Sequence, residues 1–148
     1  MLELLDIEQN YFQGELPVDV LKNLNFAINK PKSVGIIGPS GSGKTSLLNI
    51  IGLIEKPKFG SYFFKNSNCL DFSNTEKTEF RKKNIGYIFQ NNQLLEDFNV
   101  QENVALPLIL NGESYKNSCK KALNFLKLFG LENRMSFKPG LLSGGEQQ

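Results

Sequence analysis

The 148-residue chain contains no histidine and only two cysteines, Cys69 and Cys119. The cysteines lack the spacing of a metal or redox motif, and no histidine is present to complete a metal site with them. We therefore expect reduced thiols in a cytosolic protein.

No stretch approaches the roughly 18 apolar residues of a membrane span. The acidic start, MLELLDIEQN, lacks the basic then apolar pattern of a signal peptide. These features predict a cytoplasmic protein whose membrane role, if it has one, depends on a partner.

An excess of charge of one sign is also missing. The chain has 17 Lys and Arg against 15 Asp and Glu, a formal net charge of +2. Because nucleic-acid-binding domains usually carry a strong basic excess, we expect no nucleic acid partner. A hydrophobic fraction of 40% and a charged fraction of 22% are ordinary for a soluble globular protein. The length suits one domain or part of one.

Short apolar stretches bounded by turn residues predict the strands. In the first region apolar and polar residues alternate, which is the period of half-buried strands. The others are short apolar runs, and SVGIIG leads directly into glycines, as a buried strand before a tight loop does. The predicted strand regions are residues 2–28, broken near 13–17, and residues 33–38, 60–64 and 84–89.

Helical spacing follows the glycine-rich loop and dominates the later part of the chain. TSLLNIIGLI, residues 45–54, predicts a buried helix, and a further short helix is expected in the polar stretch between the last two strands. Apolar residues three or four apart over residues 115–129 predict another helix, with Gly130 as its stop. We therefore predict an α/β core in residues 1–90 and a helical subdomain in residues 91–148.

GPSGSGKT, residues 38–45, satisfies the pattern G-x-x-x-x-G-K-[ST] between a predicted strand and a predicted helix. Its glycines let successive N–H groups point inward, and the helix N-terminus adds partial positive charge. Lys44 would contact the β- and γ-phosphates, Thr45 would ligate Mg²⁺, and Ser46 would reach the α-phosphate. The alternative is a glycine-rich turn without a ligand. The predicted phosphate-binding residues are Gly38, Pro39, Ser40, Gly41, Ser42, Gly43, Lys44, Thr45 and Ser46.

GPSGSGKT, GYIFQNNQLL and the closing LSGGEQQ together resemble the nucleotide-binding domain of ABC transporters, over essentially the whole chain. GPSGSGKTSLLNIIGLIEKPKFG and NVQENVALPLIL are most similar to the subfamily that serves lipoprotein release, macrolide export and cell-division complexes. The resemblance implies an α/β fold of the P-loop NTPase, ABC-type class. It has an N-terminal antiparallel β part and a helical insert, and we expect the C-terminal part of the core to be missing from these residues.

The resemblance also implies roles outside the first loop. Gln90 would be the Q-loop glutamine that meets Mg²⁺ or its water, although alone it reads as a solvated polar residue. Tyr11 would stack on adenine; Phe12 is the competing aromatic, and a half-buried strand residue is the alternative for Tyr11. Two such domains pair head to tail, so that the signature loop binds ATP held by the other domain. Without the family, SGG reads as a turn. The residues implied for this trans site are Ser143, Gly144, Gly145 and Gln147.

The resemblance implies an ATP-binding subunit that couples ATP binding and hydrolysis to a transmembrane permease for export or lipoprotein release. Mg²⁺ is the implied cofactor, a second ATP-binding subunit the second partner, and the inner face of the cell membrane the location. The general base and histidine switch that follow the family's signature do not occur in residues 1–148. We therefore expect these residues to be an N-terminal portion that does not turn over ATP alone. A truncated remnant without catalysis and a soluble ABC protein stay open as alternatives.

Overall fold

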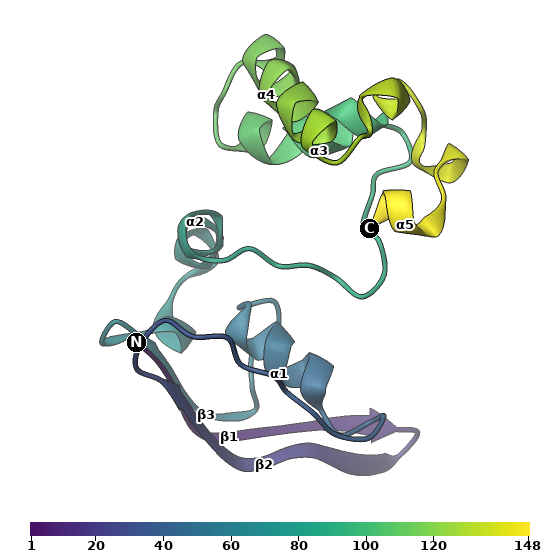
Figure 1. The fold of residues 1–148 in the computed structure, drawn as a ribbon. Helices are drawn as coiled ribbons and strands as arrows, with labels where there is room; N and C mark the ends of the chain where they lie inside the picture. The colour runs from purple at the N-terminus through teal and green to yellow at the C-terminus, as the bar shows by residue number, and fades with distance from the viewer. The chain divides into compact units, whose positions relative to one another are not determined.

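The computed structural model describes residues 1–148, which form two compact units, Met1–Tyr87 and Ile88–Gln148. Figure 1 shows a sheet with helices in the first unit, coloured purple to teal, and helices alone in the second. No helix of the chain combines the length and apolar character needed to cross a bilayer.

A long β-hairpin is the base of the first unit. β1 (Leu2–Gln13) and β2 (Leu16–Ile28) pair antiparallel from one end to the other. The two-residue turn between them begins with Gly14, whose φ of +66° is the backbone conformation that tight hairpin turns require. The structure therefore confirms the predicted strands and their break near residues 13–17.

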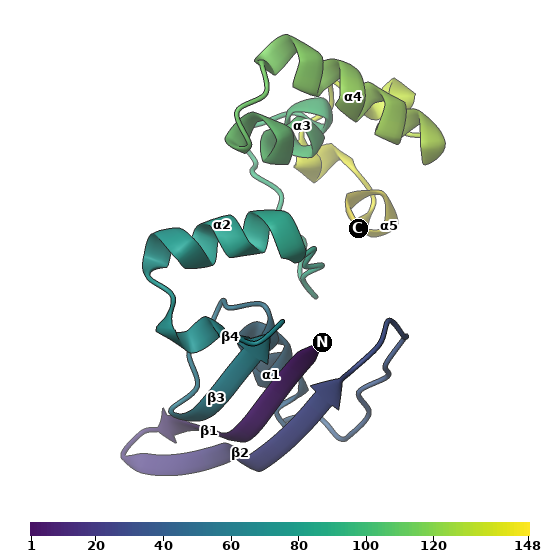
Figure 2. The ribbon, with the colours of Figure 1, turned by 90° about the vertical axis from the view of Figure 1, so that its left-hand side faces the viewer.

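Two further strands extend the sheet from the edge of β1 that faces away from β2. β3 (Phe59–Phe64) pairs antiparallel with β1, and the short β4 (Ser67–Asn68) completes the order β2-β1-β3-β4 (Figure 2). At Gly60 φ is +103°, and an added Cβ would lie 2.6 Å from the carbonyl oxygens of Leu5 and Asp6. Only glycine therefore fits where β3 meets β1. The strand predicted at residues 60–64 is confirmed.

Two predicted strands do not form. Residues 33–38 and 84–89 contain no strand, and the side chains of Ile37 and Ile88 are 94% and 86% exposed. A strand needs a neighbour that shares its backbone hydrogen bonds, and the four strands of the sheet pair only among themselves. Both predictions are therefore wrong. The apolar runs indicate a tendency to be buried, but residues 1–148 provide neither segment with a partner strand.

Helix α1 (Lys44–Ile51) lies over one face of the sheet (Figure 1). It ends before residue 54, the predicted end, because the chain turns at Leu53 into a left-handed conformation with φ +53°. The Tyr62 hydroxyl of β3 donates to the Ile51 carbonyl at 3.1 Å and so fixes the end of the helix to the sheet. The core between them consists of Leu4, Ile7, Leu21, Leu47, Ile50, Leu53, Tyr62 and Cys69.

The remaining elements are helical, and capping boxes at Ser73, Asn99 and Ser143 set three of their starts. The side chain of Ser73 accepts from the Glu76 N–H while the Glu76 carboxylate accepts from the Ser73 N–H, and Asn99 pairs with Glu102 in the same way. Such reciprocal bonds satisfy donors that a helix start leaves unpaired. The elements are η1 (Cys69–Asp71), α2 (Asn74–Asn84), α3 (Val100–Leu110), α4 (Tyr115–Leu128), η2 (Glu132–Arg134), η3 (Pro139–Leu141) and α5 (Gly144–Gln147).

In the second unit α3 and α4 pack against each other. Val100 of α3 and Leu126 of α4 are buried together with Leu142, which lies just before α5. α4 confirms the helix predicted over residues 115–129. The chain leaves it at Gly130, whose φ is +70°, as expected for a helix stop in the left-handed region.

Replacing Ile50 with alanine should lower the free energy of unfolding by about 2–5 kcal/mol, because the side chain is fully buried between α1 and the sheet. Leu48→Ala is the matched control on the same helix, since Leu48 is 45% exposed, and it should cost less than about 1 kcal/mol. Urea unfolding of both variants checks this. Equal losses would show that α1 does not pack as the structure has it.

Candidate nucleotide-binding site

The glycine-rich loop turns directly into α1. The Ser42 N–H donates to the Pro39 carbonyl at 3.3 Å, and Gly41 and Gly43 have φ values of +79° and +85°. Glycine adopts these values without the strain that a Cβ would cause. The loop thereby directs the first N–H groups of α1, and the positive end of the helix dipole, toward the loop residues.

Gly43 is also the point at which the loop touches the sheet. A Cβ added there would lie 2.8 Å from Val20 Cγ1 and 2.9 Å from the Val20 carbonyl oxygen, both on β2. Conformation and space therefore both require glycine. This contact fixes the start of α1 against the hairpin.

The ammonium group of Lys44 lies on the loop. Lys44 Nζ donates to the carbonyl oxygens of Pro39 at 2.6 Å and Gly38 at 3.0 Å, and it is 3.4 Å from Ser42 Oγ. Thr45 is exposed beside it, and Ser46 is half-buried in the first turn of α1. The structure therefore gathers a cation, helix N–H groups and two hydroxyls at one place, which are the donors that a polyphosphate requires.

Tyr11 reaches this helix from β1. Its hydroxyl donates to Glu55 Oε1 at 2.6 Å and lies 3.0 Å from Ser46 Oγ. Phe12 is 71% exposed, against 40% for Tyr11. Neighbouring residues of a strand point to opposite faces, so Phe12 points away from α1. Sequence reasoning missed Glu55, because no motif contains it and only the folded chain brings it to Tyr11.

Gln90 belongs to the second unit, where it is exposed in the segment that leads to α3. Lys44 and Thr45 belong to the first unit. The contact of Gln90 with a nucleotide-bound metal stays a prediction. The chain contains no group of three or more acidic, cysteine or histidine side chains that could hold a metal ion.

The signature loop begins α5 with a capping box. Ser143 Oγ accepts from the Glu146 N–H at 3.4 Å, and Glu146 Oε2 accepts from the Ser143 N–H at 2.8 Å. Arg134 Nε also donates to Glu146 at 3.2 Å. The bonds from Ser143, together with that from Arg134, hold the pKa of Glu146 below its usual range. Ser143 accepts in this box and keeps its own hydroxyl proton for donation to an anion.

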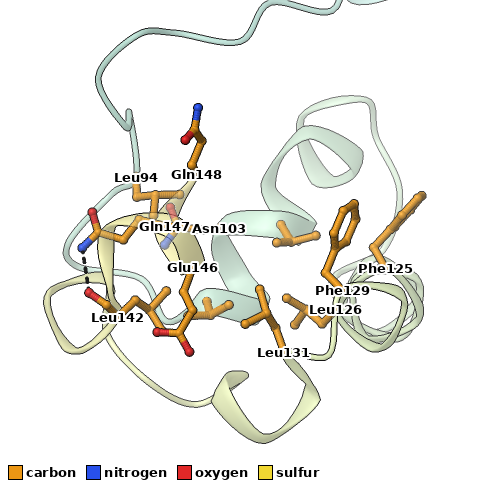
Figure 3. A pocket seen from close by; sticks show the side chains of 13 residues that line it. Leu94, Asn103, Phe125, Leu126, Phe129, Leu131, Leu142, Glu146, Gln147 and Gln148 are labelled. Atoms are coloured by element: carbon orange, nitrogen blue, oxygen red, sulfur yellow. Dashed lines mark hydrogen bonds between the residues drawn. The ribbon is translucent and has the colours of Figure 1, made fainter.

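Gln147 holds the signature loop within its unit. Its side-chain amide donates to the carbonyls of Pro139 at 2.9 Å and Leu142 at 3.3 Å, and its oxygen accepts from Asn92 Nδ2 at 3.0 Å. Figure 3 shows the bond to Leu142. The Gln147 side chain therefore joins the signature loop to the segment after Gln90 by hydrogen bonds. Its role in a trans site stays a prediction.

A cavity of about 570 Å³ lies in the second unit (Figure 3). Phe125 of α4 and Phe129, which directly follows α4, line it on one side, and Leu94 and residues of the signature loop line it on another. The walls carry one carboxylate, from Glu146, and no lysine or arginine. The lining is mostly apolar and includes no residue of the glycine-rich loop, so this cavity is distinct from the candidate nucleotide site.

The fold and the first loop define a P-loop nucleotide-binding domain of the α/β class. The sequence profile described as "ABC transporter" matches residues 21–148. The chain belongs to this family.

Its relatives include lipoprotein-releasing system ATP-binding proteins named LolD. That of Hyphomonas neptunium is 39% identical and that of Geobacter metallireducens 37% identical, each over 100% of this chain. The chain spans 65% and 66% of the length of these two relatives. Among solved structures, the ATP-binding cassette MJ0796, dimeric in a post-hydrolysis state with ADP and Pi, matches with a TM-score of 0.90 and 39% identity. The match covers 99% of this chain and 65% of that one.

Alanine at Gly43 should destabilise the protein more than alanine at Gly41. Both positions have positive φ, which costs a non-glycine residue about 1 kcal/mol or more. Only Gly43 abuts β2, whereas a Cβ at Gly41 meets no atom within 4 Å, so Gly43→Ala should cost about 1–3 kcal/mol in addition. Thermal unfolding of the pair measures the difference. A Gly41→Ala variant as unstable as Gly43→Ala would contradict the contact with Val20.

The capping box of Glu146 should make the stability of the protein depend on pH. Because the folded pKa is lowered, the ionised box stabilises the fold above the unfolded pKa of about 4.3, and this is lost as the pH falls through the folded pKa. Glu146→Gln keeps the hydrogen-bonding pattern without the titration. The difference in unfolding free energy between wild type and variant should therefore shrink on acidification, measured by urea unfolding. A difference that stays constant would contradict the assignment.

Proposed function

We propose that this chain is the ATP-binding part of an ABC transporter subunit that couples ATP binding and hydrolysis to a membrane partner for lipoprotein release. The observation that carries the proposal is the placement of Lys44 on a glycine loop that leads into α1. The relatives named as ATP-binding proteins of lipoprotein-releasing systems support the substrate class. The sequence resemblance to the subfamily that serves lipoprotein release, macrolide export and cell-division complexes also supports this function.

In this proposal the loop from Gly38 to Gly43 surrounds the phosphates of ATP. Lys44 neutralises the β- and γ-phosphates, and the backbone N–H of Ser46, which the first turn of α1 leaves unpaired, donates to the α-phosphate. Mg²⁺ fits the chain through Thr45, because an exposed hydroxyl beside the phosphates is the oxygen ligand that this ion prefers. Gln90 would supply a second oxygen. The ion, when bound, neutralises charge between the phosphates.

A second ATP-binding subunit would complete the site. The solved relatives of this fold are described as dimeric, one of them with ADP and Pi bound, which supports a head-to-tail pair for this chain. The signature residues Ser143, Gly144, Gly145 and Gln147 would then face ATP held by the partner. The transmembrane permease would bind the protein at the inner face of the membrane and select the cargo.

Lys44→Ala tests the nucleotide site directly. Loss of the ammonium should raise the Kd for MgATP about tenfold or more, since a hydrogen bond to a charged group contributes about 1.5–3 kcal/mol. Lys30→Ala, which removes an exposed lysine after β2, is the control and should change the Kd less than about twofold. Isothermal titration calorimetry gives both values. Unchanged binding by Lys44→Ala would contradict the proposed site.

A further inference from the structure

Glu55 lies outside every motif, yet its carboxylate joins the helix region to the hairpin. Its backbone N–H donates to the Asn49 carbonyl of α1 at 3.2 Å, so the end of the helix sets its place. Its Oε1 accepts from the Tyr11 hydroxyl at 2.6 Å and from the side-chain amide of Gln9. Gln9 and Tyr11 are two positions apart on β1, which puts them on one face of the strand.

Gln9 holds this carboxylate in place. It is only 8% exposed, and while its amide nitrogen donates to Glu55, its Oε1 accepts from the Lys58 N–H at 3.0 Å. Both ends of the side chain are therefore bonded. The acceptor that Glu55 offers to Tyr11 is fixed by backbone on one side and by a buried amide on the other.

The Tyr11 hydroxyl has a single proton. A carboxylate can only accept, so this proton goes to Glu55, and the phenol oxygen is left to accept from Ser46 Oγ at 3.0 Å. The bond to a charged acceptor is the stronger of the two. A hydrogen-bonded chain thus runs from Ser46, beside the phosphate loop, through Tyr11 to Glu55.

We propose that Glu55 is a positioning residue for the nucleotide base. It holds the ring of Tyr11 at a set distance from the phosphate loop, so that the base of a bound nucleotide meets an aromatic face that is already ordered. Without this hydrogen bond the Tyr11 ring rotates freely in the unbound protein and becomes ordered only when the base binds. That ordering costs free energy and weakens the affinity for the nucleotide. The inference rests on the proposed nucleotide site and concerns the base alone.

The test compares ATP with tripolyphosphate, which carries phosphates but no base, by isothermal titration of the protein at its native length. Glu55→Ala and Tyr11→Phe break the same hydrogen bond from opposite sides, and Tyr11→Phe keeps the ring. Each should raise the Kd for ATP about two- to tenfold and leave that for tripolyphosphate unchanged within about twofold. Glu15→Ala, in the exposed hairpin turn, is the control and should change neither value.

A double variant separates positioning from a general loss of structure. Tyr11→Ala removes the ring, and adding Glu55→Ala to it should cost no further ATP affinity if Glu55 acts through Tyr11. Equal weakening of ATP and tripolyphosphate by Glu55→Ala would overturn the proposal, as would a Tyr11→Phe variant that binds ATP like wild type. Unchanged binding of both ligands by Lys44→Ala would instead refute the nucleotide site itself.

Discussion

The close approach of Gly43 to β2 is the contact on which the first unit depends. With a Cβ at this position 2.8 Å from Val20 Cγ1, α1 could not start where it does, and its buried face would not meet the sheet through Ile50. The same start places Lys44 on the loop and Ser46 opposite Tyr11. The absence of a side chain at Gly43 therefore determines both how α1 packs on the sheet and where the residues of the site lie.

The two glycine loops begin their helices by different means, and the difference bears on what each can bind. At α1 the N-cap is Gly43, which provides no side-chain cap, so the first N–H groups are left to a ligand. At α5 the box of Ser143 and Glu146 occupies the amides of both residues. The amides of Gly144 and Gly145 lie outside that box. The first loop therefore leaves the N–H groups of its helix open to a polyphosphate, whereas the second has fewer free amides.

The sequence could predict those parts of the fold and the site that depend on residues close together in the chain. The hairpin follows from alternation and Gly14, α4 from its apolar spacing, and the loop from its glycines and lysine. Residues 33–38 and 84–89 could not be judged locally, because a strand depends on a neighbour that the pattern does not name. The role of Glu55 could not be predicted from the sequence for a related reason. Its partners Gln9 and Tyr11 lie on β1, far from it in the sequence, and carboxylates at the end of a helix are common on solvated surfaces.

The contacts of Lys44 indicate how the loop can be ordered and yet ready to bind. Its ammonium already holds two carbonyl acceptors, those of Gly38 and Pro39, so a polyphosphate exchanges acceptors and leaves the number of hydrogen bonds much as it was. The gain comes from replacing neutral carbonyls with charged oxygens, because such bonds are about twice as strong. The lysine therefore stabilises the loop that it serves. Affinity for a polyphosphate then depends on charge and on the free N–H groups of α1.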